Sequence, residues 1–115
     1  MLARTHRFHG YNALNFVHRQ GQVVRGQSMS LKYSINTRRD TYRVAVVVSK
    51  KVARSAVLRN RIRRRIFEAV RTQAKAIAKP YDLVFMVYNA ELAVMDAEKL
   101  RKTIADQLRK AGVVL

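Results

Sequence analysis

Residues 43–71, RVAVVVSKKVARSAVLRNRIRRRIFEAVR, carry a strand pattern followed closely by a helix pattern. The first seven, Arg43–Ser49, are nearly all apolar and β-branched, which is typical of a central strand buried on both faces. From about Ala56 to Ala78 the apolar residues recur at helical spacing. The residue before a proline disfavours helical backbone, so we expect this helix to end before Pro80. A strand followed by a long amphipathic helix predicts a layered α/β unit.

A helical wheel separates the helix into an apolar stripe and a basic face. With about 100° per residue, the stripe centred on Ile62 also contains Leu58, Ile66, Ala69, Val70 and Ile77. The opposite arc holds Asn60, Arg61, Arg63 and Arg64, with Arg65 at its edge and Arg71 near its middle. Like charges three or four residues apart on a helix repel by about 0.2–0.5 kcal/mol per pair. Glu68 relieves little of this repulsion, so the basic face predicts a polyanionic partner.

Two further strands accompany this unit. Met29–Ile35 alternates apolar and polar residues, as expected of a half-buried strand, and Asp82–Tyr88 forms a second buried strand. The two most apolar strands flank the long helix, so we expect them to be parallel neighbours in one sheet. The remaining strand is expected to pair antiparallel with Arg43–Ser49 through a turn at Asn36–Thr41.

The chain ends are predicted to be helical. Asn12–Gln20 precedes Gly21, a plausible helix cap, and Val23–Val24 form a possible extra strand. Asp96 is expected to cap a last helix that Gly112 closes. The apolar stripe of this helix would consist of Ala97, Leu100, Ile104 and Leu108. Together these elements predict one domain over residues 1–115, an α/β sandwich.

The charge of the chain is extreme. Its 115 residues include 24 Lys and Arg against 7 Asp and Glu, a net charge of +17. Such self-repulsion favours a polyanionic partner, with nucleic acid ahead of an anionic membrane surface. We find no apolar run long enough to span a bilayer and no secretory signal, so we expect a cytoplasmic protein with no membrane partner. The absence of cysteine excludes disulfides and thiolate metal sites.

The sequence offers no catalytic constellation of its own. A two-metal nuclease needs convergent carboxylates, whereas the seven here are scattered along the chain. Asp96 and Glu98 are two residues apart and would not face each other on a helix. His6, His9 and His18 are more typical of surface residues than of a general base. We therefore expect no catalytic residue, no metal ligand and no small-molecule substrate.

The segment at 43–71 resembles the protein component of bacterial ribonuclease P. That family has a buried strand, a Ser-Lys-Lys turn and an Arg-Asn-Arg sequence opening a basic helix, here Ser49-Lys50-Lys51 and Arg59-Asn60-Arg61. RFHGYNALNFVHRQG at 7–21 is similar to the family's N-terminal helix, YDLVFMV at 81–87 to its last strand, and LRKAG at 108–112 to the end of its last helix. The resemblance covers nearly the whole chain.

The resemblance implies a role in RNA processing. Members of the family bind a large catalytic RNA and help it cut the 5′ leader from precursor transfer RNA. The RNA carries the active site, and Mg²⁺, the expected cofactor, is held mainly by RNA. The expected partners are therefore ribonuclease P RNA and precursor tRNA. The implied fold is an α/β (α+β) two-layer sandwich of the ribosomal protein S5 domain 2-like type. In it, a mixed sheet of about four strands packs against a long basic helix and the N- and C-terminal helices.

The resemblance also assigns candidate residues. RNA binding falls to Lys50, Lys51, Arg54, Arg59, Asn60, Arg61, Arg63, Arg64, Arg65 and Arg71. Arginine suits this role because its planar fork bonds phosphate oxygens in pairs and stacks on bases. The candidates for contact with the leader are Leu14, Phe16, His18, Tyr33 and Ser49. For Phe16, as for Phe67 and Phe85, core packing is favoured over stacking, and for Tyr33 stacking and packing are both open.

The sequence departs from the family pattern at two places, and two rival functions remain. Leu14 and His18 occupy positions that are often aromatic in the family, and Tyr88-Asn89 replaces a frequent basic pair. One rival is a non-enzymatic structural RNA-binding protein of ribosomal type, which composition alone does not separate from the first interpretation. The other is a helix-turn-helix DNA binder, whose recognition helix would need polar readers in place of a wall of arginines.

Overall fold

The computed structural model describes residues 4–8 and 11–114. A mixed four-stranded sheet lies at its centre, with the strands in the order β1-β2-β4-β3. The strands are β1 Gln22–Val24, β2 Met29–Ile35, β3 Arg43–Val48 and β4 Tyr81–Val87. The Val23–Val24 strand is thus confirmed as part of β1, which pairs with β2 at one edge of the sheet.

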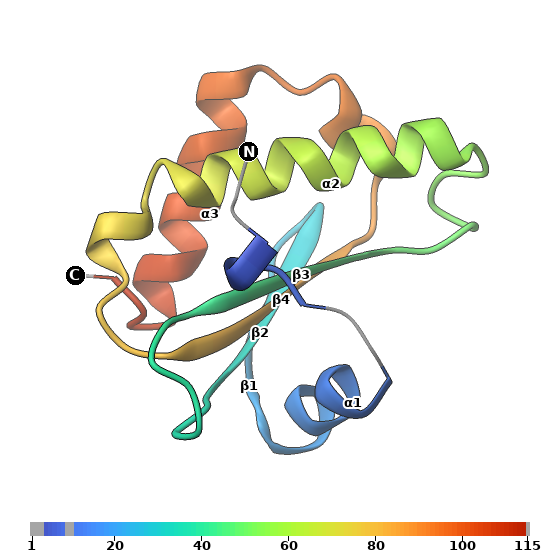
Figure 1. The fold of residues 1–115 in the computed structure, drawn as a ribbon. Coiled ribbons are helices and arrows are strands. Elements are labelled where there is room, and N and C mark those ends of the chain that lie inside the picture. The colour runs from blue at the N-terminus through green and yellow to red at the C-terminus, as the bar shows by residue number, and fades with distance from the viewer. Residues whose placement is uncertain (1–3, 9–10, 115) are drawn as a thin grey trace.

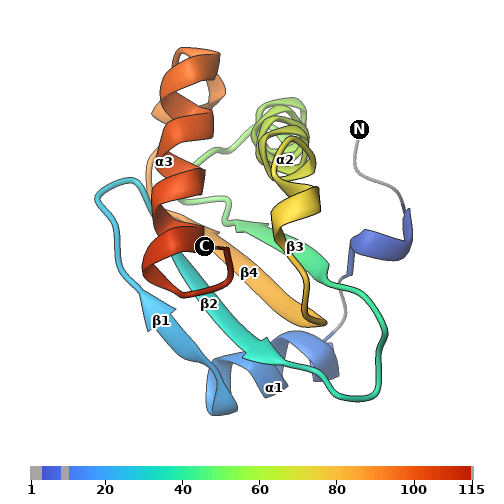
Figure 2. The same cartoon turned by 90° about the vertical axis from the view of Figure 1, so that its left-hand side faces the viewer.

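Three α-helices and three 3₁₀ turns surround the sheet. The helices are α1 Tyr11–Gln20, α2 Ala56–Arg71 and α3 Ala97–Lys110, and the turns are η1 Arg4–His6, η2 Ala74–Ala76 and η3 Ala90–Ala93. Helices α2 and α3 lie side by side on one face, and α1 lies on the other (Figures 1 and 2). The predicted α+β fold is confirmed, and α1 adds a small layer on the second face.

The strand pairing confirms one prediction and corrects another. Strands β3 and β4 are parallel neighbours, as expected, with Val44 opposite Leu83. The predicted antiparallel pairing of β2 with β3 is wrong, because β2 pairs with β4. Strand β4 is buried at five of its seven positions, which suits it to the place between two neighbours. The loop after β2 crosses the start of β4, where the Asn36 N–H donates to the Pro80 carbonyl at 2.9 Å.

Helix α2 begins as expected and ends earlier. Ser55 caps its start by accepting a hydrogen bond from the Leu58 N–H at 3.3 Å. The predicted continuation to Ala78 is wrong, since the helix ends at Arg71 and the Thr72 hydroxyl donates to the Ala69 carbonyl at 2.6 Å. The chain then turns through η2 and still buries Ile77, which is 7% exposed. Periodicity misses this end because the apolar stripe continues through the turn.

The last helix follows its predicted boundaries. Asp96 caps α3 by accepting from the Lys99 N–H at 3.2 Å. Gly112 has a φ of 76°, the left-handed conformation that glycine adopts readily after a helix. Leu100, Ile104 and Leu108 are buried as predicted. Ala97 is exposed, against the prediction, because the first turn of α3 extends beyond the sheet (Figure 2).

Two apolar clusters hold the layers together. The larger lies between the sheet and the helices α2 and α3, and it includes Leu31, Ile62, Phe85 and Ile104. The smaller lies on the α1 side and consists of Phe8, Val17, Ala45 and Val84, with Leu14, Val47 and Met86 packed against it. Because apolar and polar residues alternate along β2, Met29 and Leu31 face the larger core and the polar residues face the α1 side.

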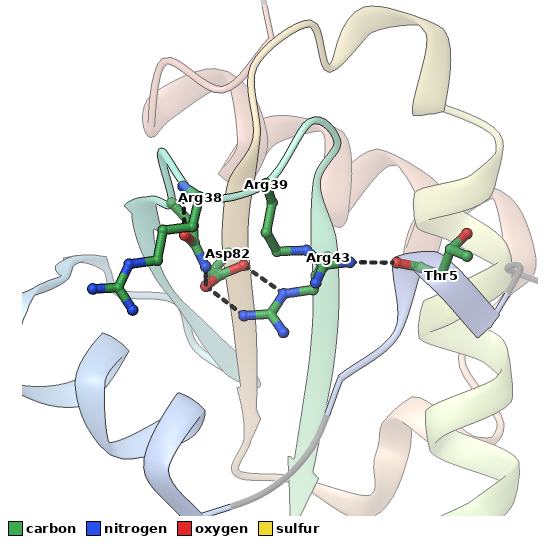
Figure 3. Close-up of polar contacts among 6 residues, drawn as sticks. Thr5, Arg38, Arg39, Arg43 and Asp82 are labelled. Carbon is green, nitrogen blue, oxygen red and sulfur yellow. Dashed lines mark hydrogen bonds and ion pairs between the residues drawn. The ribbon is translucent and has the colours of Figure 1, made fainter.

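A buried carboxylate fixes the end of the sheet near α1. Asp82, only 2% exposed, accepts two hydrogen bonds from the Arg43 guanidinium, both at 2.9 Å, and a third from the Asn36 amide at 3.1 Å (Figure 3). The Arg43 guanidinium also lies 4.4 Å from the centre of the Phe8 ring. This cluster ties the loop after β2 and the N-terminal segment to β4.

Candidate nucleic-acid interface

Helix α2 carries six arginines, and the structure divides them by where their side chains are bound. Arg59 donates to the carbonyls of Ala53 and Arg54 at 2.9 and 2.8 Å. These bonds close the turn after β3 onto the first turn of the helix. The exposed Lys50 and Lys51 lie in this same turn, so Arg59 fixes the segment that presents them.

Two arginines on the α3 side of α2 hold η3. The Arg61 Nε–H donates to the Ala93 carbonyl at 2.7 Å. Arg65 donates to the Leu92 carbonyl at 2.7 Å and also to the Met95 carbonyl. Two guanidinium groups thus satisfy three carbonyls of one turn, and Arg65 is half-buried in doing so.

The other flank of α2 faces β3. Arg63 donates to the Val46 carbonyl at 3.4 Å and to the Asn60 side-chain oxygen at 3.0 Å. Asn60 therefore orients an arginine through its oxygen, and Asn60 itself is exposed. A guanidinium has five N–H donors, so an arginine fixed by one or two of them keeps others for a phosphate.

The outer face of α2 is different. Arg71 forms an ion pair with Glu68 and holds the pKa of that carboxyl at about 2. Arg64 is exposed, and in the part of the chain that the structure describes its side chain makes no hydrogen bond or ion pair. The same is true of the side chains of Lys50, Lys51 and Arg54. We call these four side chains, Lys50, Lys51, Arg54 and Arg64, the free cations.

The arginines predicted to form one basic face are therefore of two kinds: those whose guanidinium groups bind other residues of the chain, and the exposed Arg64. The wheel places Arg59 and Arg65 close to the border of the apolar stripe, and that position is the sequence signal for an anchored arginine. Arg59 donates to carbonyls only five and six residues before it, whereas the partners of Arg61 and Arg65 have no sequence signal, because the carbonyls of η3 lie about 30 residues away along the chain.

The candidates for leader contact do not form one cluster. Leu14 packs against the smaller core beneath α1. The His18 Nδ1 lies 2.9 Å from the Lys32 Nζ, and burial, together with the Lys32 ammonium, lowers the pKa of His18 below its ordinary value. Ser49 is exposed at the far end of β3. Lys32 was not among the predicted residues, although the polar side of its alternating strand was a signal for it.

Phe16 and Tyr33 are the two aromatic candidates for contact with the leader. Phe16 is 54% exposed, so the prediction that it packs in the core is wrong. Tyr33 packs against the larger core, on the opposite face of the sheet from α1, and its hydroxyl donates to the Gln22 amide oxygen at 2.9 Å. Tyr33 and Phe16 meet only at a shallow hollow beside β2. Tyr33 is thus mainly a packing residue with an exposed edge.

A groove of about 860 Å³ runs between the N-terminal segment, β3 and α2. Its apolar walls are Phe8, Leu14, Val46, Val47, Val48 and Phe67, and its charged residues are Arg4, Arg7 and Arg63. The Arg7 guanidinium lies 5.9 Å from the centre of the Phe67 ring. Aromatic walls with arginines beside them are the features that bind single-stranded nucleic acid, through stacking and phosphate contacts.

The described residues include no helix that is both long and apolar enough to cross a membrane. The same residues contain no group of three or more histidine, aspartate or glutamate side chains that could hold a metal ion.

The sequence matches the ribonuclease P family over residues 2–112. The chain belongs to the ribonuclease P protein family. It is 37% identical over 98 residues to the ribonuclease P protein component of Roseiflexus castenholzii, covering 85% of this chain and 79% of the relative. It is 34% identical over 98 residues to that of Clostridium novyi, covering 84% and 85%.

Solved ribonuclease P proteins share the fold. The structure from Staphylococcus aureus superimposes with a TM-score of 0.83 at 23% identity, covering 96% of this chain and 98% of that one. The structure from Thermotoga maritima gives a TM-score of 0.75 at 21% identity, covering 84% and 89%. The ribonuclease P protein family supplies the protein part of a tRNA-processing ribonucleoprotein, so this chain has a role in an endoribonuclease complex.

Proposed function

We propose that this chain binds ribonuclease P RNA and the 5′ leader of precursor tRNA, and that the RNA performs the cleavage. The observation that carries the proposal is the row of free cations, which lies on a segment that anchored arginines hold in place. Lys50, Lys51 and Arg54 precede α2, and Arg64 lies on its outer face. Phosphate contacts of this kind position a protein on RNA without reading its sequence.

The leader is proposed to lie in the groove between the N-terminal segment, β3 and α2. Phe67 is half-buried and offers aromatic surface there, Arg7 and Arg63 offer guanidinium groups, and the buried Phe8 forms part of the wall. Base stacking on an aromatic side chain contributes about 1–3 kcal/mol per base and tolerates any sequence. Such a groove suits leaders that differ between precursor tRNAs.

In this proposal Mg²⁺ acts in the assembled enzyme and is held mainly by the RNA. The chain's own carboxylates serve other purposes, which supports this view. Asp82 is bound to Arg43, Asp106 to Arg109 and Glu98 to Arg101. The protein's contribution is to bind and orient the two RNA molecules, and the chain itself moves no proton and attacks no phosphorus.

Reconstitution tests the proposal. Adding the chain to a bacterial ribonuclease P RNA should raise the rate of precursor tRNA cleavage at low Mg²⁺, where the RNA alone is weakest. The chain without RNA should cleave nothing. A structural RNA-binding protein of ribosomal type would leave the rate unchanged. The absence of an effect with several bacterial ribonuclease P RNAs would therefore contradict the proposal.

A further inference from the structure

A second groove lies on the outer side of the molecule, between α2 and α3. These helices cross on the same face of the sheet, with α2 viewed nearly end-on and α3 lengthwise in Figure 2, and a hollow of about 520 Å³ opens between them. The buried side chains of Ala69 and Leu100 form its floor, the exposed Ala97 also lines it, and Arg64 and Arg101 stand on either side. The Gln73 amide bridges the helices by donating to the Arg101 carbonyl at 3.2 Å. The hollow continues past Thr72 into another of about 710 Å³, lined by Lys99 and Lys102 among others.

The groove presents more unpaired positive than negative charge. Glu68 and Glu98 both line it, but each forms an ion pair with an arginine three residues further along its own helix. Lys99 and Lys102 are exposed and, within the described residues, their ammonium groups make no ion pair. Together with Arg64 they leave the groove able to attract an anion.

We propose that this groove holds a nucleotide of the ribonuclease P RNA. Its phosphate would lie between Arg64 and Arg101, and its ribose and base would lie on the apolar floor formed by Ala69 and Leu100. A simple anion would contact only the cations, whereas a nucleotide contacts the cations through its phosphate and the apolar floor through its ribose and base. The volume falls in the range of about 300–1,000 Å³ that is usual for small-ligand sites.

The position of Arg64 supports the choice of RNA over an acidic protein. Arg64 is one of the free cations on the outer face of α2 and also lines this groove. A strand of RNA bound along α2 would therefore reach the groove without a break. The inference rests on the proposed function and extends the RNA contact from α2 to α3.

Two charge-matched double variants of α3 test the inference. The first, Arg101→Ala with Lys102→Ala, removes two of the cations at the groove and leaves Arg64 and Lys99 in place. The control, Arg109→Ala with Lys110→Ala, removes the same charge from the other end of the helix. Each arginine is paired with an acid three residues before it, Glu98 or Asp106, so each variant also removes one intrahelical ion pair. Binding to ribonuclease P RNA is measured at several salt concentrations.

The groove variant should bind roughly ten-fold more weakly, as expected from the removal of one charge-assisted hydrogen bond. Its log–log salt slope should fall by roughly 0.7–0.9 for each phosphate that the variant no longer neutralises. The control should bind as the wild type does. Equally weakened binding by both variants would show a general effect of charge and overturn the inference, as would wild-type binding by the groove variant. A wild-type chain that binds no ribonuclease P RNA would instead contradict the proposed function itself.

A cross-linking measurement does not depend on those variants. The chain has no cysteine, so Ala97→Cys places a single thiol at the groove and Ala78→Cys places one after η2. A photo-reactive label at position 97 should form an adduct with the RNA, and the same label at position 78 should not. The absence of an adduct at position 97 in a complex that forms normally would overturn the inference.

Discussion

Arg64 and Arg65 are adjacent in the sequence and have different surroundings. One residue of helix turns a side chain by about 100°, which takes Arg65 from the outer face of α2 to the flank beside η3. Arg65 is half-buried and donates to two carbonyls, whereas Arg64 is exposed. A run of arginines therefore does not define a binding surface until the partner of each guanidinium is known.

His18 should make stability fall in acid. Burial and Lys32 lower its folded-state pKa below 6.5, so the unfolded chain binds the proton more readily. Stability contributed by neutral His18 is then fully present above pH 6.5 and is lost as the pH falls below it. His18→Gln should reduce the drop in unfolding midpoint between about pH 7.5 and 5, measured with urea. Lys32→Met removes the Lys32 charge, the smaller of the two causes of the lowered His18 pKa, and should reduce the drop in unfolding midpoint less than His18→Gln does. If His18→Gln showed the same drop as the wild type, His18 would not be the source of the acid sensitivity.

Arg43 should be among the most important charged residues for stability. Arg43→Met leaves the Asp82 carboxylate buried without its cation, a change that typically costs about 3–5 kcal/mol. Arg109→Ala breaks the exposed ion pair with Asp106 and should cost less than about 1 kcal/mol. Chemical denaturation of both variants measures the difference. Similar free energies of unfolding would show that burial of the Asp82 pair has no special effect.

At the scale of elements, the sequence predicts the strands and helices well and their neighbours less well. The period of two in Met29–Ile35 tells which residues share a face, and it carries no information on which strand lies alongside. Burial does not decide between β3 and β4 as the partner of β2, because both strands are mostly buried, and only the structure shows that β2 pairs with β4. Likewise, the apolar stripe identifies α2 but not its end at Arg71.

The same reasoning applies to the candidate site. The motif at Ser49–Lys51 and the helix face locate the basic surface, because both are local features of the chain. The anchoring of arginines to η3 could not be foreseen, since it needs the packing of segments distant in sequence. The sequence alone does not decide between stacking and packing for Tyr33. The choice depends on which strand pairs with β2 and on which face of the sheet the Tyr33 side chain lies.

The contact between α2 and η3 should depend on Arg65. Arg65→Ala leaves the Leu92 and Met95 carbonyls without their donor, and a buried group that loses its partner costs about 1–3 kcal/mol. Arg64→Ala removes the same side chain from an exposed site and should change stability by no more than about 0.5 kcal/mol. Thermal or urea unfolding compares the two. If Arg64→Ala were as destabilising as Arg65→Ala, the assignment of anchored and free arginines would be wrong.

At the scale of the whole molecule, the fold explains how a chain of charge +17 stays compact. Its most buried charges are paired, as in Asp82 with Arg43, and several arginines of α2 are bound to carbonyls. The remaining cations lie at the surface, where water screens them until a polyanion binds. The sheet and its two apolar clusters connect the turn after β3, the outer face of α2 and the groove between the N-terminal segment, β3 and α2.

We propose that the free cations contact RNA phosphates while the anchored arginines hold the surface in shape. The most direct test measures the affinity of the chain for ribonuclease P RNA over a range of salt concentrations. It compares the wild type with a variant in which Lys50, Lys51, Arg54 and Arg64 are all replaced by alanine. At roughly 0.7–0.9 per phosphate, the log–log slope should decrease by roughly 3, with the unfolding midpoint unchanged. A slope equal to that of the wild type, in a variant that folds normally, would contradict the claim.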